Sequence, residues 1–595
     1  MNTIGLPLIA GFIAGVSLLG VQGSMILCVV ALALILAAAR ASSSPLVSLL
    51  IFGASCSAVA GYWVPEALRA LGATTSESYS GFALATLWSS MPGFTVLAAI
   101  AHATRRLRRK TWIAVFCFSL AAIETALLSI PGFVPWILFG YAAIEQTGLA
   151  QLAALGGVPL VSVALVICAE ALACLARPSP RRSSRGPFAI LAGFTATAIV
   201  GLPFAQFVSP PNTTDAAPIR FVAIQPKLPR PERLRPSLQE VNTERLVRFT
   251  QHAIEAFPQT TLWTLVVWPE NSILDKIDDR PRAEQIASAA AQELGRPLIL
   301  GTTSRLEADA SSVLRNRASL FSATGRLRSN ADKVRTVPAI ESSGHGWLES
   351  LARRAVGAAG EGPKIDSGYE IAPMAEAGHA VVTLCFEILF PDIVEKRRPE
   401  VATALLNLSD TSWIEDAVVS RQMITIARYR AIEQRLPLIR VAQGSGSAHF
   451  DAYGGLVEAL PPGRYGALVV DALPTHAPQA MERGMILALP CGAALLAWLL
   501  HPLLGRSVAA LCALRLDLRI TKGCDHLPNP TRRIGLHPTD PHDFRSALPR
   551  RQVARPEERV PKNERVPEVV VRFFADRRVM PAMELADAEN PREGT

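Results

Sequence analysis

Three polar side chains stand at the ends of predicted strands in the middle of the sequence, and together they have the chemistry of an acyl-transfer site. Glu270 follows "VVWP", Lys333 follows "SNAD" and Cys385 follows "VVTL". A free thiol has a pKa of about 8.5, so it needs a base or a nearby cation before it can act as a nucleophile at neutral pH. A buried carboxylate can accept the thiol proton, and a lysine ammonium can stabilise the oxyanion formed on attack. We therefore predict a Glu, Lys and Cys site that needs neither histidine nor a cofactor.

Each residue alone has a plainer interpretation. A Glu after a strand is usually a solvated turn residue or a helix cap, and a Lys at a hairpin end is usually exposed. A lone Cys is usually a small core side chain. We expect the three to meet because the ends of neighbouring strands converge on one cleft. Glu387, two residues after Cys385, is expected to turn with the chain into that cleft.

The elements that would position these residues lie in an α/β region. "IRFVAIQ" and "LWTLVVWPE" predict strands on either side of an amphipathic helix, and "NRASLFSATGRLRSNADK" predicts a hairpin that ends at Lys333. Asp416–Leu436 predicts a long helix, followed by a closing hairpin. This alternation favours one α/β domain over residues 218–475, with its sheets covered by helices.

The remainder of the chain has the composition of a membrane protein. With 50% hydrophobic and 18% charged residues and a mean hydropathy of +0.28, the chain is too apolar for an ordinary soluble protein of 595 residues. Apolar segments of roughly 17 to 23 residues recur, long enough to cross a bilayer as helices. We place spans at Ile4–Gly20, Ser24–Ala39, Pro45–Trp63, Gly81–Ala103, Thr111–Ile130, Gly148–Leu175, Phe188–Val208 and Gly484–Leu504. Residues 1–210 are thus predicted to form a membrane domain of about seven helices, and residues 484–504 one more helix.

Basic residues predict the orientation of these spans. Arg40, "RRLRRK" and "RPSPRRSSR" follow the second, fourth and sixth spans, and basic loops stay on the cytoplasmic side. The α/β domain is then expected outside the cytoplasm, with both termini inside. The alternative, that the first span is a cleaved signal peptide, is weaker because the small-residue stretch "AAARASSS" follows only the second apolar segment.

The charge and the cysteines exclude other classes of function. The net charge of +9 is explained by the membrane loops and by the tail, so we expect no nucleic-acid partner. Cys524 and His526 lie close together in the tail, but two ligands without a second pair do not predict a metal site. The tail itself, residues 506–595, is basic and Pro-rich, and we expect it to be disordered and cytoplasmic.

The combination of motifs resembles a known family. "WPE", then a Lys followed by "VP" and a Glu eight residues later, then "CFE" and "FPD", is similar to the Glu-Lys-Cys triad of the nitrilase, or carbon-nitrogen hydrolase, superfamily. "FVPWILFGYAAIEQTGLAQL" and "NLSDTSWIEDAVVSRQMITIARYRAIEQRLPLIRVAQGSG" match its membrane branch, the apolipoprotein N-acyltransferases. The resemblance implies a multi-span α-helical membrane domain and an extracytoplasmic nitrilase-like α-β-β-α sandwich.

The resemblance also implies residue roles. Glu270 corresponds to the base, Lys333 to the oxyanion-stabilising lysine and Cys385 to the nucleophile, which would carry an acyl group from phospholipid to the N-terminal amine of a lipoprotein. Glu341 and Glu387 correspond to accessory carboxylates and Asn316 to an asparagine near the pocket. The implied location is the bacterial inner membrane, with the catalytic domain in the periplasm.

A lid is predicted at Ile340–Gly362, with Trp347 and Leu348 contacting lipid; an ordinary surface loop with a short helix is an equal alternative.

Some segments depart from the family pattern and leave alternatives open. Phe386 occupies a position that is usually tyrosine in the family, and "SWIED" replaces the usual "WFGD". "AQGSGS" replaces an Asn-Asn-Gly turn, and "PAIESSGHG" replaces "PFGEY". These changes suit either an acyltransferase or a TraB-like conjugal-transfer relative. A non-enzymatic envelope factor and an amidase acting on a small amide are the remaining alternatives.

Overall fold

The computed structural model describes most of the chain before residue 477. The described residues are 4–130, 133–176, 185–208, 211–228, 232, 235–257, 262–274, 282–305, 314–338, 340–341, 347–356, 379–412, 414, 417–476 and 571–572. The predicted eighth span, nearly all of the tail, including Cys524 and His526, and much of the predicted lid therefore lie outside the described residues.

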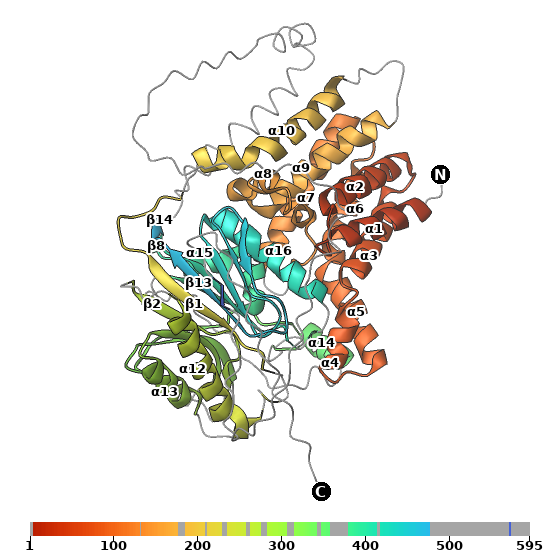
Figure 1. Ribbon diagram of the computed structural model, residues 1–595. Coiled ribbons are helices and arrows are strands. Elements are labelled where there is room, and N and C mark those ends of the chain that lie inside the picture. Colours follow the sequence, from red (N-terminus) through yellow and green to blue (C-terminus); the bar gives the residue numbers. More distant parts are fainter. Residues whose placement is uncertain are drawn as a thin grey trace, which may run out of the picture. The chain divides into compact units, whose positions relative to one another are not determined.

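Two sheets form the centre of the α/β region (Figure 1). The larger one, within the described residues, has the order β15 (Val571–Arg572), β13 (Gly466–Ala472), β1 (Ile219–Gln225), β2 (Thr264–Val267), β4 (Leu298–Arg305), β5 (Leu314–Phe321) and β6 (Leu327–Asp332), with β3 (Ile273–Leu274) beside β4. The second has the order β12 (Leu456–Ala459), β11 (Ala448–Phe450), β10 (Leu438–Ala442), β9 (Leu405–Ser409) and β7 (Val381–Leu384). A short ladder pairs β14 (Thr475–His476) with β8 (Val401–Ala402).

The sheets pack face to face and each carries helices on its outer face. Along β1, Phe221 and Ala223 join the core between the sheets, while Val222 and Ile224 join the core under the helices α12 (Gln239–Ala256) and α13 (Ala283–Leu294). This alternation is the two-residue period of a strand that is buried on both faces. Helices α15 (Pro391–Arg397) and α16 (Ala417–Gln434) lie on the other side of the pair of sheets (Figure 1). The predicted α-β-β-α sandwich is confirmed, as are the strand at β1 and the helices at α12 and α16.

The N-terminal region is helical. Its helices are α1 (Gly5–Ser17), α2 (Ser24–Ala41), α3 (Pro45–Ala60), α4 (Val64–Ala70), α5 (Thr75–Ser89), α6 (Met91–Ala103), α7 (Arg109–Ser129), η1 (Phe139–Ala143), α8 (Thr147–Ala150), α9 (Ala153–Leu175) and α10 (Arg185–Val208). Within the described residues, α2, α7, α9 and α10 are each long and apolar enough to cross a membrane, and α1 is shorter. The pairs α3 with α4 and α5 with α6 raise the number from 4 to 6 if each bent pair is one span.

Two predicted spans are divided in the structure. The segment predicted as one span from Gly81 to Ala103 is split between α5 and α6, which meet at 44°. Pro92 lies at the start of α6, and proline cannot continue a preceding helix because it lacks an N–H and clashes with the previous turn. The segment Gly148–Leu175 is likewise divided between α8 and α9, and Gly156 and Gly157 inside α9 are non-helical. The number of spans stays a prediction.

Helix α16 joins the sandwich to the N-terminal helices. Its Tyr429 hydroxyl donates to the carbonyl of Gly140 in η1 at 2.5 Å, and Arg428 pairs with Glu145 at 2.7 Å. Val419, Ile426 and Tyr429 belong to one buried core that also contains residues of α2 and α9. The outer helix layer of the sandwich is therefore shared with the helical region.

Candidate active site

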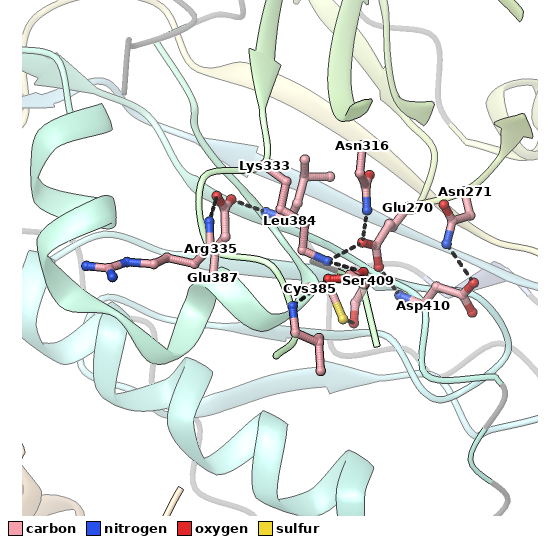
Figure 2. Close-up of polar contacts among 12 residues, drawn as sticks. Glu270, Asn271, Asn316, Lys333, Arg335, Leu384, Cys385, Glu387, Ser409 and Asp410 are labelled. Atoms are coloured by element: carbon pink, nitrogen blue, oxygen red, sulfur yellow. Dashed lines mark hydrogen bonds and ion pairs between the residues drawn. The ribbon is translucent and has the colours of Figure 1, made fainter. Parts of the chain in front are cut away.

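Glu270 lies just beyond the carboxyl end of β2, where Pro269 ends the strand (Figure 2). It is only 2% exposed. Its Oε1 accepts from Asn316 Nδ2 at 2.8 Å and from Lys333 Nζ at 3.0 Å, and its Oε2 accepts from the backbone N–H of Asp410 at 2.9 Å. The carboxylate thus has a fixed position and three donors, two of which are neutral.

Lys333 directly follows β6 and is 1% exposed. Its backbone N–H donates to the carbonyl of Asn316 at 2.8 Å, which ties it to β5. Its ammonium lies between two carboxylates, Glu270 at 3.0 Å and Glu341 at 2.8 Å. An ammonium has three N–H donors. Among the described residues two are used, so one remains for a reacting oxygen.

Cys385 follows β7 and begins the 3₁₀ turn η4 (Cys385–Leu389). Its φ is +44°, a left-handed conformation that costs a non-glycine residue on the order of 1–3 kcal/mol and persists only where surrounding contacts enforce it. Asn407 Nδ2 donates to the Cys385 carbonyl at 3.2 Å, and the Ser409 hydroxyl donates to Sγ at 3.4 Å. Both partners come from β9, which pairs with β7 in parallel. These contacts from β9 hold Cys385 in its left-handed conformation.

Glu387 does not turn into the cleft, and that prediction was wrong. It is fully buried and forms a two-pronged ion pair with Arg397, at 2.6 and 3.1 Å. Its carboxylate also accepts from the N–H groups of Leu384 at 3.0 Å and Val334 at 2.6 Å. These are the neighbours of Cys385 and Lys333 in the chain. Burial explains the difference, because the carboxylate needs the guanidinium of Arg397 to compensate its charge there.

The charges in the site shift the ionisation of its members. Burial raises the pKa of the Cys385 thiol to about 12, with Glu270 adding to the effect and Lys333 opposing it. Burial also raises the pKa of Glu270, although Lys333 opposes this shift. Desolvation disfavours charge on Lys333, but Glu270, Glu341 and Cys385 together raise its pKa well above the ordinary value. The resting site therefore holds a thiol, a basic carboxylate and an ammonium.

The structure brings together five of the eight residues predicted from the sequence: Glu270, Asn316, Lys333, Glu341 and Cys385. Glu270 and Lys333 follow β2 and β6 of the larger sheet, which are separated by β4 and β5, and Cys385 follows β7 of the second sheet. The expectation that the strands lie side by side was therefore wrong, because the packing of two sheets face to face brings these ends together. Trp347 and Leu348 begin α14 (Trp347–Val356), but their side chains lie outside what the structure describes. Phe386 is buried and packs edge-on against Phe390, at 5.4 Å between ring centres.

Sequence reasoning missed several residues around the site. Asp410 holds Glu270 through its N–H, Gln443 Nε2 donates to the Glu270 carbonyl at 3.1 Å, and Arg440 Nη1 donates to Asn407 Oδ1 at 2.6 Å. All three lie on or just after β9 and β10. Polar residues on or directly after these apolar strands were the sequence signal that could have identified them as neighbours of the site. Over the described ranges, His, Cys, Asp and Glu side chains do not gather in a group of three or more suited to a metal ion.

Comparisons with known proteins agree with this arrangement. Residues 10–171 match the apolipoprotein N-acyltransferase N-terminal domain, and residues 233–471 match the carbon-nitrogen hydrolase family. The chain is 28% identical over 353 residues to an apolipoprotein N-acyltransferase of Brucella melitensis, covering 58% of this chain and 65% of that protein. It is 27% identical over 379 residues to that of Brucella suis, covering 63% and 66%. The chain thus spans just under two thirds of the length of these curated relatives.

Among solved structures, the crystal structure of a carbon-nitrogen hydrolase from Helicobacter pylori G27 aligns with 43% of this chain and 89% of its own, at 15% identity and a TM-score of 0.31.

Proposed function

The chain belongs to the apolipoprotein N-acyltransferase family of the nitrilase superfamily, and we propose that it transfers a fatty acyl group from a membrane phospholipid to the N-terminal amine of a diacylglyceryl-cysteine lipoprotein. The observation that carries the proposal is the buried contact of Lys333 with Glu270 and Glu341 beside the strained Cys385. A thiol, a base and a cation in one dry site are what acyl transfer through a thioester requires.

In the first step, the Glu270 carboxylate takes the proton of the Cys385 thiol and the sulfur attacks the ester carbon of the phospholipid. A C–S bond forms, and the carbonyl oxygen becomes an oxyanion that the remaining N–H of Lys333 stabilises. Collapse of this intermediate breaks the C–O bond. The proton held by Glu270 passes to the departing oxygen, which leaves a lysophospholipid and an acyl thioester on Cys385.

In the second step, the free amine of the lipoprotein's terminal cysteine attacks the thioester carbon. A C–N bond forms, the C–S bond breaks, and Glu270 moves the amine proton to the departing sulfur. Glu341 and Asn316 act as positioning residues, because they hold Lys333 and Glu270 at 2.8 Å each and make no contact of their own with the thiol in the described contacts.

The helical region fits this reaction because both substrates are anchored in lipid. Because the catalytic domain shares its helix layer with the membrane helices, the thiol lies at the bilayer surface. Neither lipid-anchored substrate then has to leave the membrane in order to react. The basic loops described above support an inner-membrane location with the sandwich on the periplasmic side.

The alternatives have less support. The relatives named above are acyltransferases, which favours this reaction over a conjugal-transfer role. A non-enzymatic envelope factor would have little reason to keep a buried carboxylate, ammonium and strained cysteine, since buried charges are costly to stability and are not needed for the fold. An amidase would release its acyl group to water rather than to an amine, so the products distinguish the two reactions.

The test uses the purified full chain in detergent with phosphatidylethanolamine and a synthetic diacylated lipopeptide. Mass spectrometry is expected to find the N-acylated lipopeptide with the wild type and with Cys174→Ala, a control at a thiol in α9, but not with Cys385→Ala. Free fatty acid without acylated peptide would indicate a hydrolase. Equal product from wild type and Cys385→Ala would overturn the proposal.

A further inference from the structure

A fully buried arginine lies on the strand two positions away from β7 in the second sheet. Arg440 in β10 is 0% exposed, as are Asn407 in β9 and Thr383 in β7. The register places the three opposite one another, since Thr383 pairs with Asn407 and Asn407 pairs with Arg440. The adjacent Leu406 and Val441 belong to the core between the sheets, so by alternation the three polar side chains point to the other face, toward the helices. We call these three residues the polar row.

The polar row is connected to the backbone of Cys385. Arg440 Nη1 donates to Asn407 Oδ1 at 2.6 Å, and Asn407 Nδ2 donates to the Cys385 carbonyl and to Thr383 Oγ1, both at 3.2 Å. The amide of Asn407 is therefore held at both ends, its oxygen by a cation and its nitrogen by the residue whose φ is +44°. A charged donor at the oxygen also polarises the amide and strengthens the bonds that its nitrogen donates.

Arg440 differs in its partners from the two other arginines that are no more than 2% exposed. Arg397 pairs with Glu387 at 2.6 Å, and Arg430 pairs with Glu433 at 3.1 Å. Arg440 forms no ion pair with a described residue, and its Nε and Nη2 atoms have no hydrogen-bond partner there. A buried charge without a counter-charge is costly to stability, so the presence of this guanidinium needs an explanation beyond the fold.

The ionisable groups that act on Arg440 are members of the proposed site. Burial lowers the pKa of its guanidinium, and the charged forms of Cys385 and Glu270 oppose that shift. Such coupling is reciprocal, so the guanidinium in turn favours the thiolate of Cys385 over the thiol. Lys333 opposes the burial that raises the pKa of the thiol, and Arg440 acts in the same direction. Part of the counter-charge that Arg440 lacks is therefore supplied when the thiol loses its proton.

We propose that Arg440 is a positioning residue for Cys385: through Asn407 it holds the left-handed backbone of the nucleophile, and its charge stabilises the thiolate. This inference rests on the proposed function and deepens it, because it assigns different roles to the two cations. Lys333 stabilises the oxyanion on the substrate, whereas Arg440 stabilises the sulfur that attacks it. The reactivity of the thiol can also be measured without either lipid substrate, which separates the two proposals experimentally.

The test is the rate at which iodoacetamide alkylates Cys385 in the folded full chain in detergent, followed from pH 7 to pH 10 by mass spectrometry of the peptide that contains it. The thiolate is the species that reacts. Arg440→Met keeps much of the side-chain volume but removes the charge. It is expected to slow alkylation about ten-fold, because loss of a nearby opposite charge raises the pKa of a thiol by about one or more. Arg440→Lys keeps the charge and is expected to restore most of the rate.

The sign of the effect distinguishes this role from a structural one. Burial is what raises the pKa of the thiol, so a variant that merely loosens the site would expose Cys385 and speed its alkylation. Arg430→Met is the matched control, because it removes another fully buried arginine, whose partner is Glu433 in α16. It is expected to lower the melting temperature without slowing alkylation of Cys385.

Asn407→Asp gives a second variant should Arg440→Met fail to fold. It keeps the size of the side chain but places a carboxylate against Arg440, so the charge is neutralised and alkylation is expected to slow in the same way. Alkylation that is not slowed in either variant would overturn the proposal. Equal slowing by Arg430→Met, or an Arg440→Lys protein as slow as Arg440→Met, would also overturn it.

Thioester formation from phosphatidylethanolamine, measured on the same variants, connects this role to the proposed reaction. Arg440→Met is expected to slow it about as much as it slows alkylation, because both reactions use the thiolate of Cys385. A wild type that shows the expected differences in alkylation but forms no thioester would overturn the proposed function and still support the role of Arg440 at the thiol. Thioester formation at the wild-type rate in Arg440→Met would overturn that role.

Discussion

At the residue scale, the site depends on one ammonium held between two carboxylates. Lys333 contacts Glu270 and Glu341; Lys333 and Glu270 are buried, and Glu341 is partly exposed. Such a group is a poor source of stability, because the desolvation of buried charges offsets much of their attraction. The arrangement instead affects the ionisation of its members. The carboxylate of Glu270 is made more basic than usual while the ammonium of Lys333 stays charged.

The pH dependence of thioester formation should report the basicity of Glu270. The step needs Glu270 deprotonated, and burial raises its pKa, so the rate is expected to fall on acidification at a pH above the ordinary Glu value of 4.5. Lys333 stays protonated over the same range, so its titration adds no second loss of rate near neutrality. Single-turnover thioester formation from pH 4 to pH 9 gives the profile.

Glu270→Gln is the control for that profile. The variant keeps the shape of the side chain but cannot take a proton, so the rate is expected to fall by roughly 10²–10⁴-fold and to lose its acidic limb. A wild-type rate that stays constant down to pH 4.5, or a Glu270→Gln enzyme that keeps the wild-type profile, would show that another group is the base.

The sequence predicts the proposed Glu, Lys and Cys group but not its neighbours. Glu270, Lys333 and Cys385 can be found because each follows a predicted strand, and the family resemblance adds Glu341 and Asn316. Asp410 acts through its backbone N–H, for which no side-chain type is required. The orientation of Glu387 depends on Arg397, ten residues away and buried for reasons that only the packed structure reveals.

At the element scale, Glu387 and Arg397 hold three chain segments together. Arg397 donates to the carbonyls of Asp332 in β6 and Val382 in β7, at 2.7 and 2.9 Å. Glu387 accepts from the N–H groups of Leu384 and Val334, the chain neighbours of Cys385 and Lys333. This pair therefore sets the spacing between the end of β6 and the end of β7. The Glu387–Arg397 pair thus helps to position Lys333 and Cys385, which directly follow these two strands.

Removing Arg397 should destabilise the fold strongly. Arg397→Ala leaves the Glu387 carboxylate buried without its partner, a loss of about 3–5 kcal/mol in the free energy of unfolding. Thermal unfolding in detergent, compared with the exposed control Arg248→Ala, measures it. The double variant Glu387→Gln with Arg397→Ala should recover part of the loss, because the amide carries no charge and its single oxygen can still accept from one of the two N–H groups, that of Leu384 or that of Val334. A double variant no more stable than Arg397→Ala would contradict this cause.

The elements themselves could largely be predicted from the sequence, whereas their bends could not. β1, α12 and α16 follow directly from hydrophobic periodicity. The division between α5 and α6 falls inside one continuous apolar stretch, Gly81–Ala103, so hydropathy alone does not locate it, and Pro92 is its local signal. The loops after β9 and β10 show the same limit. Ser412 and Gln443–Ser445 belong to two separate departures from the family pattern, and only the parallel pairing of β9 and β10 brings them together.

At the scale of the whole molecule, the two predicted domains share one helix. Gln422 of α16 accepts from the indole N–H groups of Trp63 at 3.0 Å and Trp136 at 2.8 Å. Its own amide donates to the carbonyls of Leu18 and Ala60, both at 3.0 Å. One side chain of the sandwich thus joins the ends of α1 and α3 to the segment before η1. The sequence predicts the two domains but contains no local signal for this contact.

Gln422→Leu should weaken this junction. The variant leaves two indole donors and two carbonyl acceptors without their partner, and the expected cost is about 1–3 kcal/mol for each group that water cannot reach. The melting temperature in detergent is expected to fall clearly below that of Gln285→Leu, a control at an exposed glutamine of α13. Equal melting temperatures would mean that Gln422 does not hold the two regions together.

The most direct test of the whole account is the mass of Cys385 after the purified protein is incubated with phosphatidylethanolamine of one defined acyl chain. We predict an adduct of that acyl mass on the peptide containing Cys385, released by hydroxylamine, absent from Cys385→Ala and lost again when a diacylated lipopeptide is added. A folded wild-type protein without this adduct, or an adduct that persists in Cys385→Ala, would contradict the account.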